Sequence, residues 1–235
     1  MRRSTHRVVA SLAVALCSVA GCSSEPDGLI VSEEFPSVEG VATSIVRIVG
    51  FGCGAPALGS GFAVEPHLIV TSGHLVTGRD PDSLAVIRPD GQEAPARLVA
   101  FDPDFDLAVL RVDGIEFEPV TLRTTVPTDV GLGMAVRSEN AVTPIDFTVD
   151  NPVIVNWDGV FRDSESTFHG LRLLADIARG DSGSGLFISD TEVIGLIHST
   201  NRNGLERGYA VSGLQITEYL DTIDPTTEVI ADRCA

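Results

Sequence analysis

Three residues far apart in the chain, His74, Asp106 and Ser182, are of types that can activate one another. A serine hydroxyl is a weak nucleophile until a neutral imidazole takes its proton. The imidazole in turn needs a carboxylate that fixes its tautomer and stabilises its cationic form. We therefore expect a catalytic triad for acyl transfer, in which Ser182 attacks, His74 moves the proton and Asp106 orients His74.

The sequence around the first two residues is consistent with this chemistry. His74 lies in the small-residue turn "TSGHLV", directly after an apolar run. Asp106 stands at the head of the apolar stretch "LAVL", where a carboxylate is costly to bury without a partner. Asp102 and Asp104 are alternatives to Asp106, but they lie in a "DPD" segment typical of turns. Taken alone, His74 would be read as a loop or core histidine, and it is the company of Asp106 and Ser182 that favours catalysis.

Ser182 lies in the glycine-rich segment "GDSGSG", which begins at Gly180. Because glycine has no Cβ, a tight turn here can aim the N–H groups of Gly180 and Ser182 at one point. Two convergent N–H groups stabilise the oxyanion of an acyl-transfer intermediate. We expect these amides to form an oxyanion hole and Asp181 to orient the loop; the alternative is a hairpin loop that is merely rich in small residues.

The elements that must position these residues are short strands. Runs of β-branched or alternating residues recur about every dozen residues, separated by Gly, Pro and Asp, which is typical of an all-β barrel or sandwich. They fall into two groups: "SIVRIVG", "GSGFAV", "HLIVTS", "SLAVIRP", "ARLVAF" and "LAVLRV", then "GMAVRS", "NPVIVNW", "LRLLAD", "SGLFIS", "EVIGLIHS" and "GYAVS". The pattern predicts two six-stranded antiparallel barrels over residues 41–122 and 127–213, a helix over 214–223 and a tail over 224–235.

Taken together and in this order, the three segments resemble the trypsin-like (chymotrypsin-fold) serine proteases. The matching motifs are "GSGF" followed by "VTSGH", then "DLAVL", "GDSGSG", "VIGLIHS" and "GYAVSGLQITEYL". The resemblance covers about residues 41–223 and is nearest to the actinobacterial periplasmic serine proteases linked to acid resistance. It implies two chymotrypsin-like barrels and an exported serine endopeptidase that acts on protein or peptide substrates without a cofactor or metal.

One departure from the family leaves a second function open. Most members read "GDSGGP" where this chain reads "GDSGSG", so Ser184 changes the wall of the site. The alternative to an active protease is therefore a protease-fold protein that only binds partners at the cell surface.

Two residues bear on specificity through the same resemblance. Asp176 lies six residues before Ser182, where trypsin-like enzymes place the floor of the primary specificity pocket, and a carboxylate there selects Arg or Lys. His198 lies on the strand expected to line that pocket, where some bacterial relatives use a histidine to accept Glu. The alternatives are an Asp176 that faces away and a partly buried His198 bonded to the backbone.

The N-terminus reads as a targeting segment. Three arginines precede an apolar run over residues 8–20, which is shorter than the roughly 20 residues of a membrane-spanning helix. The run ends in "VAGC", which resembles a bacterial lipobox. We expect a signal peptide over 1–21, lipidation of Cys22, an acidic flexible tether over 22–40 and anchoring to the outer face of the cytoplasmic membrane or cell envelope. The alternative is ordinary signal cleavage with Cys22 an incidental thiol.

Cysteine usage and charge complete the expectations. Once the targeting segment is set aside, Cys53 and Cys234 form an even pair in an exported protein. The relatives that this chain resembles also have a Cys pair, which joins the early barrel to the extreme C-terminus. We expect a Cys53–Cys234 disulfide; the alternative is two free thiols. The formal net charge of -17 argues against nucleic acid as a partner, and no CxxC or His cluster suggests a metal.

Overall fold

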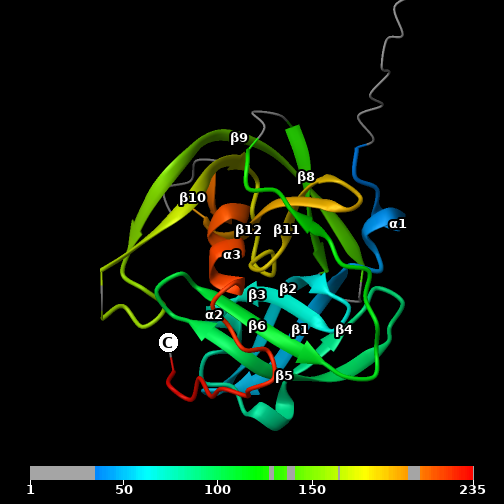
Figure 1. The fold of residues 1–235 in the computed structure, drawn as a ribbon, viewed down its shortest axis with the longest axis vertical. Helices are drawn as coiled ribbons and strands as arrows, with labels where there is room; N and C mark the ends of the chain where they lie inside the picture. The colour runs from blue at the N-terminus through cyan, green and yellow to red at the C-terminus, as the bar shows by residue number, and fades with distance from the viewer. Residues whose placement is uncertain (1–34, 127–129, 137–140, 164, 201–206, 235) are drawn as a thin grey trace, which may run out of the picture. The chain divides into compact units, whose positions relative to one another are not determined.

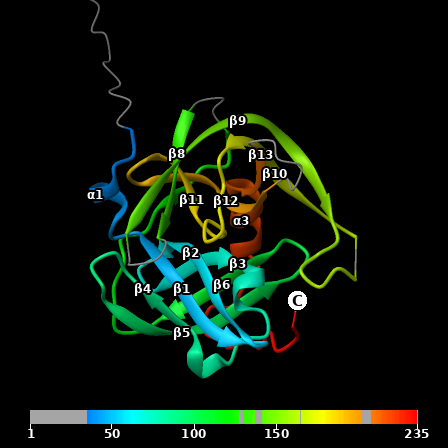
Figure 2. The ribbon, with the colours of Figure 1, turned by 180° about the vertical axis from the view of Figure 1, so that it is seen from behind.

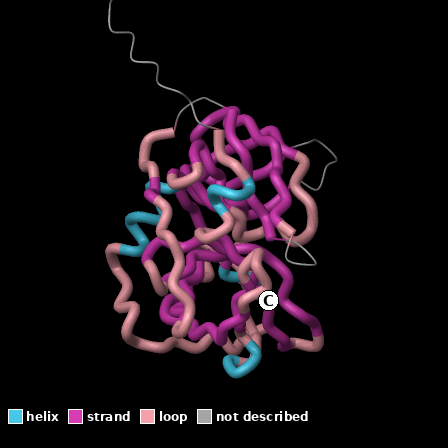
Figure 3. Tube along the Cα trace, turned by 90° about the vertical axis from the view of Figure 1, so that its right-hand side faces the viewer, coloured by secondary structure: helices cyan, strands magenta, loops and turns pink. Residues whose placement is uncertain are grey.

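The computed structural model describes residues 35–126, 130–136, 141–163, 165–200 and 207–234 (Figure 1). The expected signal peptide, Cys22 and most of the tether lie outside these ranges. Within them, no helix is long and apolar enough to cross a membrane. Strands make up about half of the described chain, with a few short helices before, between and after them (Figure 3).

The first barrel is a closed antiparallel sheet with strand order β1-β2-β3-β6-β5-β4 (Figures 1 and 2). Alternate strand residues point into it, because successive side chains of a strand face opposite sides, and they form an aliphatic core that includes Ile48, Ile69 and Leu110. Its strands are β1 (Ile45–Gly52), β2 (Ala55–Glu65), β3 (Leu68–Ser72), β4 (Ala85–Ile87), β5 (Glu93–Asp102) and β6 (Leu107–Val112).

The second sheet forms a ring. Its strand order is β11-β8-β9-β10-β13-β12, and the pairing of β11 with β12 joins the two ends. Its strands are β8 (Val130–Val136), β9 (Val142–Trp157), β10 (Ser166–Ala175), β11 (Gly185–Ser189), β12 (Glu192–Thr200) and β13 (Arg207–Ser212). The short β7 (Thr121–Leu122) pairs in parallel with β12. The predicted all-β fold of two barrels with a terminal helix is confirmed.

The two sheets share a hydrophobic core at their contact. One cluster of buried side chains draws Phe62 and Leu107 from the first barrel and Phe168 and Phe187 from the second. A backbone hydrogen bond also crosses here, since the Ser60 N–H of β2 donates to the carbonyl of Ser182 in the "GDSG" loop before β11. The loops that carry the candidate residues therefore meet where both barrels contribute buried surface.

The described ranges also contain short helical segments: α1 (Val38–Val41), α2 (Gly73–Val76), the 3-10 turn η1 (Pro81–Ser83) and α3 (Gly213–Leu220). The hydroxyl of Ser212 caps α3 by accepting from the Gln215 N–H at 3.2 Å. The last residue of α3 is Leu220, so the helix ends three residues before the predicted end at residue 223.

The folded domain begins before residue 41. The Ser37 side chain caps α1 by accepting from the Gly40 N–H, and the Ser37 N–H donates to Asp190 Oδ1 at 2.6 Å. Residues 35–40, which we expected to close the flexible tether, therefore pack on the second sheet.

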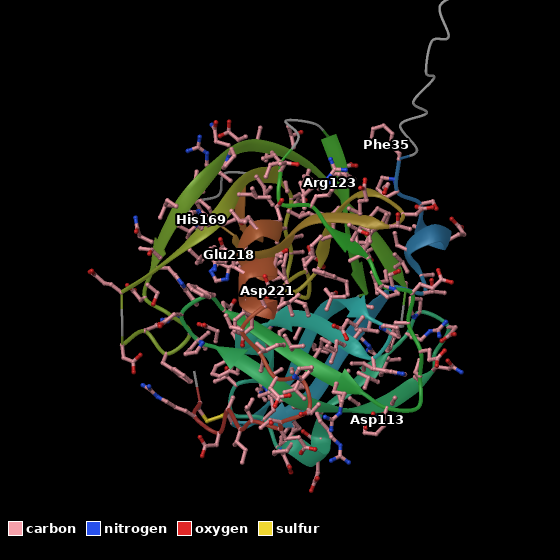
Figure 4. All side chains as sticks on the ribbon, viewed as in Figure 1. Phe35, Asp113, Arg123, His169, Glu218 and Asp221 are labelled. Carbon is pink, nitrogen blue, oxygen red and sulfur yellow. A yellow bond between two sulfur atoms is a disulfide. The ribbon has the colours of Figure 1, made fainter. Side chains whose placement is uncertain are left out.

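The C-terminal tail lies against the first barrel rather than extending freely. The Val229 N–H donates to Leu98 O at 2.9 Å, and the Gly78 N–H donates to Ala231 O at 2.6 Å. A disulfide joins Cys53 to Cys234, with the two Cα atoms 5.9 Å apart; it is the yellow bond in Figure 4. The tail is thus held next to the turn that follows α2.

Candidate active site

His74 is carried by α2, a single helical turn between β3 and the loop before η1. All five residues of β3 are buried, which fixes the start of this turn. The neighbouring Gly73 packs against Phe101 and the backbone of Asp106, and a Cβ at Gly73 would lie 3.0 Å from the Phe101 ring. The His74 side chain itself is 37% exposed, whereas Gly73 before it and Leu75 after it are buried.

Asp106 lies in the turn that joins β5 to β6, and its side chain is fully buried. Its backbone takes a φ of 54°, a left-handed conformation that Asp adopts more readily than most residues. Its carboxylate binds His74 twice: Oδ2 accepts from His74 Nδ1 at 2.8 Å and Oδ1 accepts from the His74 N–H at 2.7 Å. The turn is tied to α2 once more, because the Gly73 N–H donates to Asp106 O at 2.8 Å.

The electrostatics of this pair favour an ionised carboxylate. Burial alone would raise the pKa of Asp106, but attraction to His74 and hydrogen bonds from His198 and His74 outweigh it and hold that pKa well below its usual range. Burial alone would lower the pKa of His74, but attraction to Asp106 and its hydrogen bond raise that pKa overall. Because an ionised carboxylate only accepts hydrogen bonds, His74 Nδ1 carries the hydrogen and Nε2 is left free to take a proton.

Ser182 lies on the "GDSG" loop before β11, partly exposed. Its carbonyl accepts from the Ser60 N–H at 2.9 Å, and the next residue, Gly183, donates its N–H to Ile197 O at 2.9 Å. At Gly183, with φ of 85°, a Cβ would clash with the carbonyl of Ser60, so a glycine is required for the loop to approach β2 this closely.

The nucleophile loop and the histidine turn meet across one glycine. A Cβ on Gly59 would strike the side chain of Leu75, the residue after His74, and would lie 2.9 Å from Ser182 O. The Ser182 backbone and the residue after His74 thus lie against the same glycine of β2. Within the described part of the chain the Ser182 hydroxyl makes no hydrogen bond, so its bond to His74 stays a prediction.

The loop geometry leaves two amides available for an oxyanion. Gly180 has a φ of 102°, which only glycine adopts readily. Asp181 is buried, its Oδ2 accepts from the Ala178 N–H at 2.8 Å, and its carbonyl accepts from the Ser184 N–H at 3.0 Å. Among the described residues, none accepts a hydrogen bond from the N–H of Gly180 or of Ser182. The expectation that Asp181 orients the loop agrees with these contacts.

The departure from the family motif has a structural counterpart. The Ser184 side chain is fully buried, and its Oγ has no hydrogen-bond partner among the described residues. Its backbone is well bonded, because the Ile197 N–H donates to Ser184 O at 2.9 Å. The extra hydroxyl is therefore enclosed in the interior of the protein.

Asp176 and His198, the two residues expected in the specificity pocket, lie in different surroundings. Asp176 is exposed just after β10 and lines a cavity of about 480 Å³ together with Pro144, Ile145, Asp146, Leu174, Ala175 and Ala178. Ser182 is not among the lining residues. The role of Asp176 in specificity stays a prediction.

His198 is buried, with 7% of its side chain exposed, and its Nδ1 lies 2.7 Å from Asp106 Oδ2. Among the described residues, its Nδ1 bonds to that carboxylate and not to the backbone, the alternative given above. The sequence held no signal for this contact, because it depends on an irregular pairing of β12 with β13 at this residue. Within the described ranges, no group of His, Cys, Asp and Glu side chains could hold a metal ion.

The fold is that of the trypsin-like peptidases, and the trypsin-like peptidase domain family model matches residues 59–196. The chain belongs to this family.

Among individual relatives, serine protease Rv3671c of Mycobacterium tuberculosis is 24% identical over 89% of this chain and 53% of its own length. A probable periplasmic serine endoprotease, DegP-like, of Halomonas elongata is 33% identical over 60% of this chain and 29% of its own. The chain therefore spans about half the length, or less, of these curated relatives. The solved active form of the Rv3671c protease has a TM-score of 0.75 at 22% identity and covers 96% of this chain and 99% of that one. The HtrA-type protease AlgW with tripeptide has a TM-score of 0.64 at 23% identity, over 79% of this chain and 62% of that one.

Proposed function

We propose that this protein is an exported serine endopeptidase that hydrolyses peptide bonds through His74, Asp106 and Ser182. The observation that carries the proposal is the double attachment of His74 to the buried Asp106, at 2.7 and 2.8 Å. This attachment leaves His74 Nε2 as a base beside the "GDSG" loop. Membership of the trypsin-like peptidase family supports the same reaction.

The residues act in sequence on a peptide carbonyl. Ser182 Oγ bonds to the carbonyl carbon while its proton passes to His74 Nε2, and the N–H groups of Gly180 and Ser182 donate to the new oxyanion. The C–N bond then breaks as His74 gives its proton to the leaving amine, which leaves an acyl-enzyme. Water repeats the two steps and releases the acid. Asp106 stays ionised throughout, since its pKa is held low.

A fluorophosphonate probe tests the proposal, because it reacts with an activated serine. The wild-type protein should be labelled, and Ser182→Ala should not. Ser184→Ala is the matched control, since it removes a hydroxyl two residues away that faces the interior, and it should keep its label. A folded wild-type protein without label would contradict the proposal and favour the alternative, a protease-fold protein that only binds partners.

The substrate and the location follow from the family and the N-terminus. We infer a protein or peptide substrate and no nucleic acid, in keeping with the acidic net charge of -17. The DegP-like relative is named periplasmic, which supports export of this chain by its residues 1–21. Lipid on Cys22 would then hold the domain at the membrane. Metabolic lipid labelling should mark the wild type and not Cys22→Ala; an unlabelled, freely secreted wild type would contradict the anchor.

A further inference from the structure

Asp106 binds two imidazole rings through the same oxygen. Oδ2 accepts from His74 Nδ1 at 2.8 Å and from His198 Nδ1 at 2.7 Å, while Oδ1 accepts from the His74 backbone N–H at 2.7 Å. We propose that His198 is a positioning residue of the active site: it holds the Asp106 carboxylate in the orientation that binds His74 and shares its charge. This proposal rests on the proposed function.

The ring of His198 is aimed at Asp106 by the backbone. Strand β12 pairs with β13 in a register that shifts between Ile197 and Ser199, so the irregularity falls on His198. A bulge of this kind re-aims a side chain out of the regular alternation of a strand. The ring then lies in the interior, 7% exposed, with its Nδ1 against a carboxylate of the other barrel.

Two aromatic side chains fix the ring from the sides. Trp157 meets it edge-on with ring centroids 4.6 Å apart, and Phe168 does so at 5.5 Å. The Trp157 Nε1–H donates to Asp104 O at 2.7 Å, two residues before Asp106 in the same turn. The β5–β6 turn and the His198 ring are therefore held in one frame, which leaves the ring little freedom to turn toward a substrate.

The chemistry of the carboxylate explains the use of a second ring. A buried carboxylate without enough donors is costly and tends to take up a proton. Without His198, the carboxylate of Asp106 would keep only His74 as a side-chain donor, and its Oδ2 would accept one hydrogen bond instead of two. The hydrogen bond from His198 favours the ionised form of Asp106. The negative charge is then present when His74 becomes cationic, and the carboxylate cannot swing away from His74 Nδ1.

Two amide substitutions separate this role from simple packing. His198→Asn places an amide N–H where Nδ1 stands, whereas His198→Gln carries its amide one bond further and misplaces the donor. We expect His198→Asn to keep most of kcat and His198→Gln to lose it by roughly 10–100-fold, the range that misplacement of a catalytic group costs. KM should stay within about twofold in both, because a group that acts only on the transition state alters kcat and not ground-state binding.

The kinetic outcomes decide between alternatives. Equal kcat for His198→Asn, His198→Gln and the wild type, with all three folded by circular dichroism, would show that the ring only fills space and would overturn the proposal. An increase in KM at unchanged kcat would place His198 against the substrate and would overturn it as well.

A spectroscopic measurement tests the bond without turnover. An imidazole N–H that donates to a buried carboxylate gives a strongly deshielded proton signal. The wild-type protein should show two such signals, and His198→Gln should lose one and keep that of His74. A wild type with a single signal would overturn the proposal. If the wild type failed to react with a fluorophosphonate, the proposed function would fall, while the number of these signals would still decide whether His198 binds Asp106.

Discussion

His74 binds Asp106 at two points, through its backbone N–H to Oδ1 and through its ring Nδ1 to Oδ2. The two bonds have different effects. The first fixes where the carboxylate lies, and the second fixes which nitrogen of the ring carries the hydrogen. A change at Asp106 can therefore keep the position of the side chain and still destroy the tautomer.

Asp106→Asn should act in this way. The amide keeps the shape of the side chain, but its NH₂ group can face His74 Nδ1 and then favours the wrong tautomer. We expect kcat to fall by about 10⁴-fold with a nearly unchanged fold, the size of effect that this change has in such triads. Steady-state kinetics and circular dichroism measure both. Asp113→Asn, at an exposed position labelled in Figure 4, is the control and should keep full activity.

The pH dependence of activity should follow one proton on His74. The Asp106 carboxylate raises the pKa of His74, so kcat/KM should fall as pH drops through a midpoint above about 6.5, the usual histidine value. Asp106 has a lowered pKa and should not titrate in this range. Proton NMR of the His74 ring in Ser182→Ala measures the midpoint directly. Adding Asp106→Asn removes the attracting charge and should lower it; an unmoved midpoint would contradict the assigned cause.

The same groups link stability to pH in opposite directions. The raised pKa of His74 contributes stability that is fully present below the unfolded value and is lost as pH rises through the folded one. The lowered pKa of Asp106 contributes stability present above its unfolded value and lost as pH falls toward the folded one. Thermal unfolding in Asp106→Asn should therefore lose most of the pH dependence that this pair supplies.

The Cys53–Cys234 disulfide closes a loop of 181 residues in sequence separation. In the chain-entropy model a loop of this size is worth about 5 kcal/mol, chiefly through the unfolded state. The double variant Cys53→Ser and Cys234→Ser should therefore unfold roughly 10–20 °C lower, given about 2–4 °C per kcal/mol for a domain of this size. Calorimetry measures the shift. Thiol titration of the non-reduced protein gives an independent check, since two free thiols at these positions would mean that the bond does not form.

Removing the hydroxyl of Ser184 and that of Thr71 should have different effects on the free energy of unfolding. Ser184 Oγ is buried without a partner among the described residues, so Ser184→Ala should be neutral or stabilising by up to about 1 kcal/mol. Thr71 Oγ1 is also buried but donates to Ser60 O at 2.6 Å, so Thr71→Val should cost about 1 kcal/mol or more. Denaturant unfolding compares the two. A loss on Ser184→Ala as large as that on Thr71→Val would show that the Ser184 hydroxyl is bonded.

Specificity is tested at two carboxylates of the same cavity. If Asp176 selects basic residues, a peptide library should show cleavage after Arg or Lys, and Asp176→Ser should abolish that preference. Asp146 lines the same cavity and is likewise exposed, so Asp146→Ser is the matched control and should keep it. A wild type that prefers Glu or small apolar residues would remove Asp176 from this role.

The strands could be predicted from the sequence because their alternation and the turns between them are local. Arg47, for example, lies in an alternating run that predicts a strand, and the structure places it inside β1. The end of the helix could not be fixed, since Thr222 and Ile223 continue the helical pattern while the chain turns at Asp221. The contact of His198 with Asp106 was out of reach for a different reason. It depends on a shifted register and on two aromatic rings from other strands, and neither leaves a pattern in the sequence.

The hydrogen bond from Ser60 to the carbonyl of Ser182 has a consequence for the timing of biosynthesis. His74 and Asp106 belong to the half of the chain that is made first, and Ser182 belongs to the half that follows it. A partly synthesised or partly translocated chain would hold a complete base and no nucleophile. The later half, folded by itself, would lack the strand on which its serine loop rests. Peptidase activity would then be acquired only when the whole chain is present and both halves have docked, so that an unfinished copy could not cleave its neighbours.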